Sequence, residues 1–359
     1  MWNHKPSNMK TAIITTLLLA LGLHCNASPA TKLIQRMAKI QKNGIMVGHQ
    51  DDPVYGHDWK WEQGRSDVKE TCGDYPAVMG FELGDLEIGK DKNLDGVPFD
   101  RMRNEIKAQH RRGGIVEISW HPNNPATGKN AWDPEGKPVA KILPGGQLSK
   151  EFAKRMKRVA TFLASLRDER GQLIPVIFRP WHEMGGGWFW WGKNSCTTEQ
   201  YKQLYVYTYQ FMKRQGLNNL VWGFSPNAGD KSLETYYPGD RYVDLIGVDL
   251  YDFDGKAENY SQNVHRELSR LTEMGKSHKK LIALTETGSQ QLPINNWFSS
   301  VLWPAIKPYP ICYVLFWRNA WDNHKELYVP YAGHRDADDF KQWTEDPRVL
   351  TVKDIAKTR

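Results

Sequence analysis

Short apolar runs recur along this chain, and each is followed by enough residues for a helix before the next run begins. We predict eight buried strands, at residues 44–47, 77–83, 114–119, 174–178, 220–224, 243–248, 281–284 and 313–316. Apolar runs of this length without polar alternation are typical of strands that are covered on both faces. Apolar residues spaced three to four apart predict helices at residues 31–42, 99–112, 148–170, 198–215, 262–274 and 336–343.

This alternation of strand and helix predicts the fold. Strands separated by helices run parallel with right-handed crossovers, and eight such units close into a (β/α)8 TIM barrel, an α/β fold. A doubly wound open sheet is the competing architecture, but it needs a glycine-rich phosphate loop after its first strand. Residues 48–53 read Gly-His-Gln-Asp-Asp-Pro instead. We therefore expect a single barrel domain with its functional residues in the segments that follow the strands.

The composition suits one large domain that binds a flat ligand. The 359 residues are 40% hydrophobic and 25% charged, which is enough for a large core. The net charge of +7 is mild for this length and the basic residues are scattered, which argues against a nucleic-acid partner and against membrane insertion of the mature domain. Fifteen tryptophans and fifteen tyrosines exceed the needs of packing and indicate a ligand that stacks on rings. We expect a monomer without a cofactor.

The N-terminus is typical of an export signal. Two lysines precede an apolar run at residues 11–23, and small residues follow it. The run has 13 residues, fewer than the roughly 20 that cross a bilayer. We therefore expect a signal peptide at residues 1–27, with cleavage near Ala27 to Ala30, and a periplasmic or secreted catalytic domain at residues 31–359.

The cysteines leave two questions open. Cys25 suggests a lipoprotein anchor, but lipoprotein signals carry a small residue before the cysteine and here that residue is His24. Lipid anchoring is therefore the less favoured interpretation. The mature chain keeps Cys72, Cys196 and Cys312, which allow one disulfide and one free thiol and whose spacing fits no metal knuckle.

The most informative stretch is residues 173–192, LIPVIFRPWHEMGGGWFWWG. An apolar strand ends in a polar turn that contains Glu183, and three glycines and four aromatic residues follow. Aromatic rings suit the apolar C–H faces of pyranose sugars, and a carboxylic acid suits a glycosidic oxygen. The stretch therefore predicts one wall of a sugar-binding cleft, in preference to a core strand that happens to end in an acid.

A second acid, Glu286, follows the seventh strand, across the barrel mouth from Glu183. Two carboxyl groups about 5 to 5.5 Å apart perform retaining glycoside hydrolysis, one as acid/base and the other as nucleophile. The apolar surroundings of Glu183 favour its protonated form, whereas Tyr251 on the sixth strand could donate a hydrogen bond to ionised Glu286. Arg179 would bias any nearby carboxyl towards ionisation, so the residues alone leave the two roles open.

Residues 179–192, RPWHEMGGGWFWWG, resemble the signature of glycoside hydrolase family 26, which consists largely of endo-β-1,4-mannanases. The resemblance covers most of the mature chain and continues, in the family's order, through Trp120-His121-Pro122, Asp249-Leu250-Tyr251, Thr285-Glu286-Thr287-Gly288 and Trp317-Arg318-Asn319. It implies a retaining enzyme that cleaves β-1,4-mannosidic linkages in galactomannan, glucomannan and mannooligosaccharides by double displacement.

The resemblance also implies roles for single residues. Glu183 would be the acid/base and Glu286 the nucleophile. The substrate-binding residues would be His121, Arg179, His182, Trp188, Asp249, Tyr251, Trp317 and Arg318. One departure is visible: the Asn-Gly that the family carries after the acid/base motif is here Gly-Gly-Gly, residues 185–187, which removes a side-chain amide on the leaving-group side.

Metal chemistry fits the pattern less well. His49, His121 and His182 all end strands, as metal ligands on barrels do, but the chain has no His-x-His pair and no His-Glu-x-x-His motif. We therefore predict no metal at these histidines. Residues 91–96 begin like a calcium loop, but Met102 stands where the loop needs a glutamate, which favours a polar turn.

Two functional alternatives stay open. A non-catalytic barrel with the same cleft would capture a polysaccharide without cutting it, and another family member would cut xylan or mixed-linkage glucan. The presence of both glutamates favours hydrolysis over capture. Long loops after the second strand (residues 84–98), the third strand and the eighth strand (residues 319–338) could wall off one end of the cleft and set the product length, so endo and exo action are both open.

Overall fold

The computed structural model describes residues 1–3 and 27–358. The predicted signal peptide, residues 1–27, lies almost entirely outside the described residues. Within the described residues, no helix is long and apolar enough to cross a membrane.

Eight parallel strands close into a barrel, which confirms the predicted fold. In sheet order they run β10, β9, β8, β7, β6, β5, β4 and β1, and β10 pairs with β1 to close the ring. Their bounds are β1 Ile45–Gln50, β4 Val78–Glu82, β5 Ile115–Trp120, β6 Val176–Pro180, β7 Leu220–Phe224, β8 Leu245–Asp252, β9 Leu281–Ser289 and β10 Tyr313–Phe316. The parallel order places all their carboxyl ends at one mouth of the barrel.

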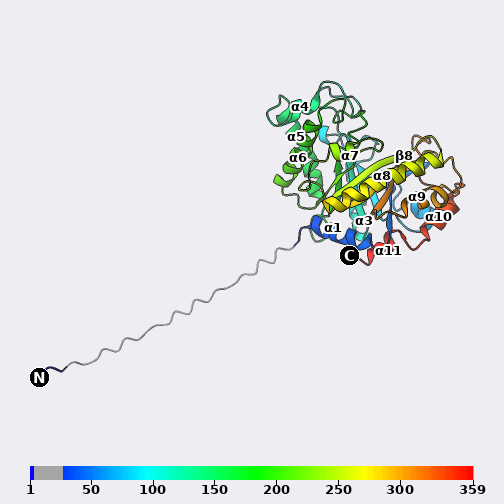
Figure 1. Ribbon diagram of the computed structural model, residues 1–359, viewed down its shortest axis with the longest axis horizontal. Coiled ribbons are helices and arrows are strands. Elements are labelled where there is room, and N and C mark those ends of the chain that lie inside the picture. The colour runs from blue at the N-terminus through cyan, green and yellow to red at the C-terminus, as the bar shows by residue number, and fades with distance from the viewer. Residues whose placement is uncertain (4–26, 359) are drawn as a thin grey trace.

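Helices surround the barrel, and α8 crosses one face of it with α5 and α6 on one side and α9 and α10 on the other (Figure 1). The longer helices are α3 Phe99–Arg112, α5 Ser149–Ser165, α6 Thr198–Arg214, α8 Ala257–His278 and α10 Ala337–Thr344. Short helical segments are α2 Asp67–Cys72, η1 Leu86–Ile88, α4 Pro138–Ile142, α7 Ser232–Thr235, η2 Phe298–Leu302, α9 Trp303–Ile306 and α11 Val352–Ala356. Outside the ring, β2 Tyr55–Gly56 pairs with β3 Trp59–Lys60, and β11 Val349–Leu350 pairs with β1.

Helix α1 (Pro29–Ile40) closes the amino end of the barrel. Ser28 caps it by accepting a hydrogen bond from the backbone N–H of Thr31. Its buried face, which includes Met37, packs on the first residues of the strands, such as Met46 of β1. Figure 1 shows α1 beside α11 at this end of the molecule. The opposite end, where the strands finish, is left open for a site.

Several boundaries differ from the predictions. The predicted strands at 243–248 and 281–284 are longer, as β8 and β9, because their ladder continues through polar pairs such as Asp249 with Glu286. Glu286 therefore lies within its strand and not in the loop after it. Helix α5 ends at Ser165, before the predicted residue 170, because Asp168 begins a tight turn back to β6. The cysteines of the described chain are all free thiols: Cys72, Cys196 and Cys312.

Candidate active site

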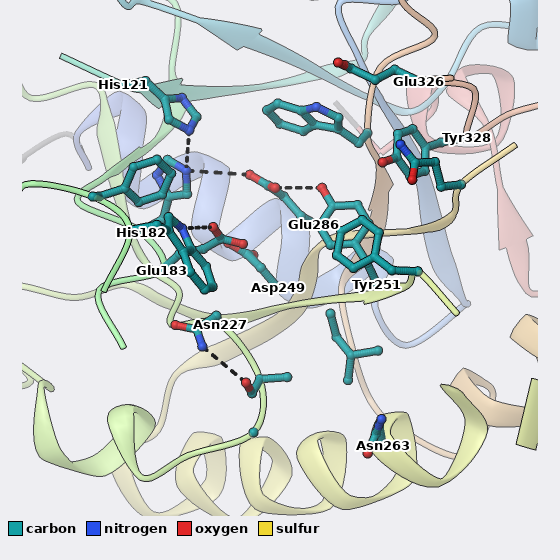
Figure 2. A pocket seen from close by; sticks show the side chains of 18 of the residues that line it. His121, His182, Glu183, Asn227, Asp249, Tyr251, Asn263, Glu286, Glu326 and Tyr328 are labelled. Atoms are coloured by element: carbon teal, nitrogen blue, oxygen red, sulfur yellow. Dashed lines mark hydrogen bonds and ion pairs between the residues drawn. The ribbon is translucent and has the colours of Figure 1, made fainter. Parts of the chain in front are cut away.

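A cleft of about 610 Å³ opens at the carboxyl ends of the strands (Figure 2). Its walls come from the ends of β8 and β9 and from the segments that follow β5, β6, β7 and β10. The predicted residues that line it are His121, His182, Glu183, Trp188, Asp249, Tyr251, Glu286 and Trp317. Arg179 and Arg318 were also predicted, and both lie behind its walls.

Arg179 of β6 lies beneath the cleft, fully buried, and contacts three carboxylates. Its Nε donates to Glu117 Oε1 at 2.7 Å, its Nη1 donates to Asp249 Oδ2 at 3.0 Å, and its Nη2 donates to Glu286. Burial acts to lower the pKa of Arg179, but the carboxylates outweigh burial and raise that pKa well above its ordinary value. The planar guanidinium therefore remains charged and fixes the position of Glu286.

Glu183 and Glu286 face each other across the cleft. One carboxylate oxygen from each of Glu183, Asp249 and Glu286 lies within 4.8 Å of the other two. The Tyr251 hydroxyl donates to Glu286 Oε2 at 2.8 Å, and Trp188 Nε1 donates to Glu183 Oε2 at 3.0 Å. Retaining glycosidases hold their carboxyl groups about 5 to 5.5 Å apart and inverting enzymes about 6.5 to 9.5 Å apart, so this spacing fits a retaining reaction.

The two glutamates have different surroundings. Burial raises the pKa of Glu183 to about 7, and the negative charge of Glu286 adds to the rise. Glu286 accepts hydrogen bonds from Arg179 and Tyr251, which hold its carboxyl group in place. The cleft thus places a carboxyl group that can give a proton near neutral pH opposite a second carboxyl group that a guanidinium and a hydroxyl hold in position.

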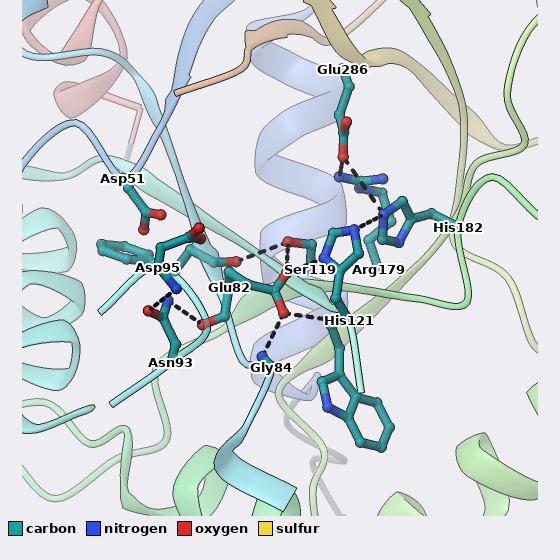
Figure 3. Close-up of polar contacts among 12 residues, drawn as sticks. Asp51, Glu82, Gly84, Asn93, Asp95, Ser119, His121, Arg179, His182 and Glu286 are labelled. Carbon is teal, nitrogen blue, oxygen red and sulfur yellow. Dashed lines mark hydrogen bonds and ion pairs between the residues drawn. The ribbon is translucent and has the colours of Figure 1, made fainter. Parts of the chain in front are cut away.

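Glu82, the last residue of β4, anchors a buried polar chain that leads to the cleft (Figure 3). Its carboxylate accepts hydrogen bonds from Ser119 Oγ at 2.6 Å and from both the backbone N–H and Nδ1 of His121 at 2.7 Å. His121 Nε2 lies 3.0 Å from His182 Nε2, which in turn lies 3.9 Å from Glu286 Oε1. Glu82 was not among the residues predicted from the sequence, although an acid within the apolar run 77–83 was a usable signal.

The pKa values of the two cleft histidines are shifted in opposite directions. Burial opposes a charge on His121, but nearby carboxylates, Glu82 foremost, outweigh it and raise the pKa of His121. Burial, assisted by His121 and Arg179, lowers the pKa of His182 well below its ordinary value. Charged His121 can therefore donate through Nε2 to neutral His182. The third histidine at a strand end is His49, whose Nδ1 lies 3.0 Å from Oδ1 of Asp52.

The sequence model of glycosyl hydrolase family 26 matches residues 24–327 of this chain. The chain belongs to glycoside hydrolase family 26. Two family relatives are mannan endo-1,4-β-mannosidases. The one from Bifidobacterium adolescentis is 32% identical over 276 residues, which are 73% of this chain and 27% of that protein. The one from Bacillus subtilis strain 168 is 30% identical over 285 residues, which are 74% of this chain and 73% of that protein.

The fold of the family 26 chain also matches a solved structure closely. The β-mannanase of this family from Bacteroides ovatus superposes with a TM-score of 0.88 and 43% sequence identity, over 91% of this chain and 95% of that one. The present chain spans only about a quarter of the length of the Bifidobacterium relative, but nearly all of the Bacteroides structure.

The glycine run that departs from the family 26 pattern is explained by crowding. A Cβ atom at Gly185 would lie 2.0 Å from Ser232 Oγ, so the asparagine side chain of the family has no room unless Ser232 moves. Gly187 has a φ of +77°, a conformation that glycine adopts without strain. Glu183 itself has a φ of +53°, which is uncommon for a residue with a side chain. The turn after β6 is therefore tightly constrained around the acid.

Arg318, which the family 26 resemblance places among substrate contacts, lies behind the wall of the cleft. Its Nη1 is 2.6 Å from Asp95 Oδ1 and its Nε donates to Glu326 Oε2 at 2.6 Å. Glu326 lines the cleft, so Arg318 borders the substrate space through this side chain. Residues 91–96 form the predicted polar turn, in which Asn93 Oδ1 accepts from the backbone N–H groups of Asp95 and Val97. A direct contact of Arg318 with substrate stays a prediction.

Proposed function

We propose that this chain is a β-1,4-mannanase that hydrolyses mannans by double displacement with retention of configuration. The observation that carries the proposal is the pair of Glu183 and Glu286, which have oxygens within 4.8 Å of each other, with the pKa of Glu183 raised to about 7. The substrate class is supported by the relatives, which are named mannan endo-1,4-β-mannosidases, and by the Bacteroides β-mannanase.

In the first step, Glu286 attacks the anomeric carbon while Glu183 gives its proton to the glycosidic oxygen, so that the leaving sugar departs as an alcohol. The sugar is left covalently bound to Glu286. Arg179 and Tyr251 hold the attacking carboxylate in place and therefore limit its motion before attack. The indole N–H of Trp188 donates a hydrogen bond to Glu183 and orients its carboxyl group towards the cleft.

In the second step, Glu183 is ionised and removes a proton from a water molecule, which attacks the anomeric carbon and frees Glu286. A pKa of about 7 suits both halves of the cycle, because Glu183 must first give and then take a proton.

The remaining side chains of the cleft suit sugar rings and hydroxyl groups. Trp188 and Trp132 are about half exposed and line the cleft, where their faces can stack on pyranose rings. His121 and His182 present ring nitrogens that can bind sugar hydroxyls. We further propose that residues 31–359 act as an exported monomer, periplasmic or secreted, on the strength of the N-terminal sequence pattern.

The substrate is tested by measuring reducing sugar released from galactomannan, xylan and mixed-linkage glucan side by side. We expect release from galactomannan at a rate far above the other two, and NMR should show the β-anomer forming first. Equal or greater release from xylan or mixed-linkage glucan would assign the chain to another β-glycan.

The acid/base role is tested with Glu183→Gln. General acid catalysis contributes about 10²- to 10⁴-fold, so we expect polysaccharide turnover to fall by that factor while mannan binding is kept. An aryl mannobioside with a good leaving group needs no proton and should still form the covalent intermediate with the variant. Glu199→Gln, at an exposed position on α6, is the control and should keep full activity. Unchanged turnover in Glu183→Gln would contradict the proposed acid/base role of Glu183.

A further inference from the structure

Two histidines and an aspartate converge outside the catalytic cleft, although they come from opposite ends of the chain. His57 and Asp58 form the turn between β2 and β3, and His324 lies in the segment between β10 and α10. His57 Nε2 is 3.2 Å from Asp58 Oδ2, and His324 Nε2 is 2.8 Å from Asp58 Oδ1. One ligand atom from each residue lies within 4.8 Å of the other two.

We propose that His57, Asp58 and His324 form a binding site for a divalent transition-metal ion such as Zn²⁺. Zinc binds imidazole nitrogen and carboxylate oxygen at about 2.0 to 2.2 Å, so neighbouring ligand atoms of a tetrahedral site lie roughly 3.3 to 3.5 Å apart. The separations of 3.2 and 2.8 Å, which join the histidines to different oxygens of Asp58, are shorter than that edge by about 0.1 to 0.7 Å. Small side-chain rotations therefore bring the three atoms around one ion.

The donor set selects the class of ion. Imidazole nitrogens suit zinc, copper and nickel, whereas calcium and magnesium require shells of oxygen atoms that a single carboxylate does not provide. The three catalytic-cleft carboxylates Glu183, Asp249 and Glu286 also lie close together, but Arg179 already supplies the positive charge there. The histidine cluster is therefore the better cation site of the two.

One side of the site is exposed to solvent, and on the other side a neighbouring ring restrains one of the histidines. Tyr331 stacks on the His57 ring at a centroid distance of 4.0 Å and an interplanar angle of 11°, which restricts the ring orientation. The His57 side chain is 16% exposed, whereas those of Asp58 and His324 are 64% and 62% exposed. An ion can thus enter from solvent, and a water molecule can take the fourth position.

A bound ion would link the β2–β3 hairpin to a segment that shapes one wall of the cleft. The segment that carries His324 also carries Glu326 and Tyr328, both of which line the cleft. The hairpin and this segment already touch where Lys60 Nζ lies 3.5 Å from the ring centroid of Trp321. Coordination across the same junction would restrain this segment and stabilise the folded state in proportion to ion occupancy.

The test compares zinc binding by the full chain and by three variants. Protein is stripped with a chelator, zinc is titrated by calorimetry, and thermal unfolding is followed with and without the ion. We expect one zinc per chain and a rise in Tm of about 4 °C at a hundredfold excess of free zinc over Kd. His324→Ala and Asp58→Asn should lose the binding and the rise in Tm, and both should melt close to the wild type in chelator because their side chains are exposed.

His278→Ala is the matched control. His278 also pairs with an exposed aspartate, Asp240, at 2.6 Å, but no second histidine of the described residues joins them. This variant should bind zinc as the wild type does. Zinc bound by His324→Ala with unchanged affinity would place the ion elsewhere, for example at the catalytic carboxylates, and would overturn the proposal. Failure of the wild type to bind at micromolar zinc would show that the cluster is an ion pair only.

Discussion

Replacing Glu82 with glutamine tests whether the buried chain through His121 and His182 supports catalysis. The amide keeps the size of the side chain but removes the charge that accepts from His121 Nδ1, its backbone N–H and Ser119 Oγ. Hydrogen bonds to a charged group contribute about 1.5 to 3 kcal/mol each, and every 1.36 kcal/mol is tenfold in rate. If one such bond is lost in the transition state, kcat/KM on mannan should fall roughly 10- to 150-fold.

The pH profile separates this effect from a general loss of structure. Charged His121 opposes the rise in the pKa of Glu183, and removing the Glu82 charge lowers the pKa of His121, which favours the neutral imidazole. The pKa of Glu183 should then rise above about 7, and the alkaline limb of activity should move to higher pH. For charges on the order of 7 Å apart, Coulomb's law gives about 0.6 kcal/mol in water and about 2.4 kcal/mol at an effective dielectric constant of 20. The limb should therefore move by about 0.4 to 1.7 pH units.

The measurement is kcat/KM across pH for the wild type, Glu82→Gln and the control Glu87→Gln. Glu87 is also fully buried, but it accepts from the backbone N–H of Asn123 and from Trp120 Nε1 and contacts no imidazole. Its variant should keep the position of the alkaline limb. Two results would show that Glu82 does not act on Glu183 through His121. One is an equal loss of kcat/KM in both variants with the alkaline limb of Glu82→Gln unmoved. The other is movement of that limb to lower pH.

Two further predictions concern the same cleft. In the wild type, kcat/KM on mannan should decline as pH rises through about 7, because burial and Glu286 raise the pKa of Glu183 to about 7 and the acid form is lost above it; a rate that stays level well beyond that pH would contradict the assignment. Arg179→Lys should lower the free energy of unfolding by about 3 to 5 kcal/mol, measured by denaturant titration, because an ammonium group cannot contact three buried carboxylates at once. Arg158→Lys, which changes a single bond to the carbonyl of Glu87, is its control, and equal losses in both would contradict the argument.

The barrel was predictable because its strands are buried on both faces, so each is a continuous apolar run. The extensions of β8 and β9 were not, because Asp249 and Glu286 are polar and the strand continues only through pairing with its neighbour. The cleft acids could be predicted since a strand end beside an aromatic run is a distinctive pattern. Glu82 was missed because its role depends on His121, whose position next to it is set by the register of β4 and β5.

Short elements escaped prediction for a related reason. The hairpin of β2 and β3 has two residues in each strand, too few for any periodicity to be detected. The sequence likewise could not predict that His324 lies near His57. Only the closure of the barrel brings β1 next to β10, and with them the segments that follow these strands.

Tyr313, Glu117 and Arg179 form a continuous series of contacts across the inside of the barrel that ends on Glu286. These residues belong to β10, β5, β6 and β9, so strands from opposite sides of the ring hold the proposed nucleophile. Turnover and ring closure should consequently disappear together during unfolding. The rate of sugar release, measured at increasing denaturant concentration, would then report the fraction of molecules in which the barrel is closed, without any spectroscopic label.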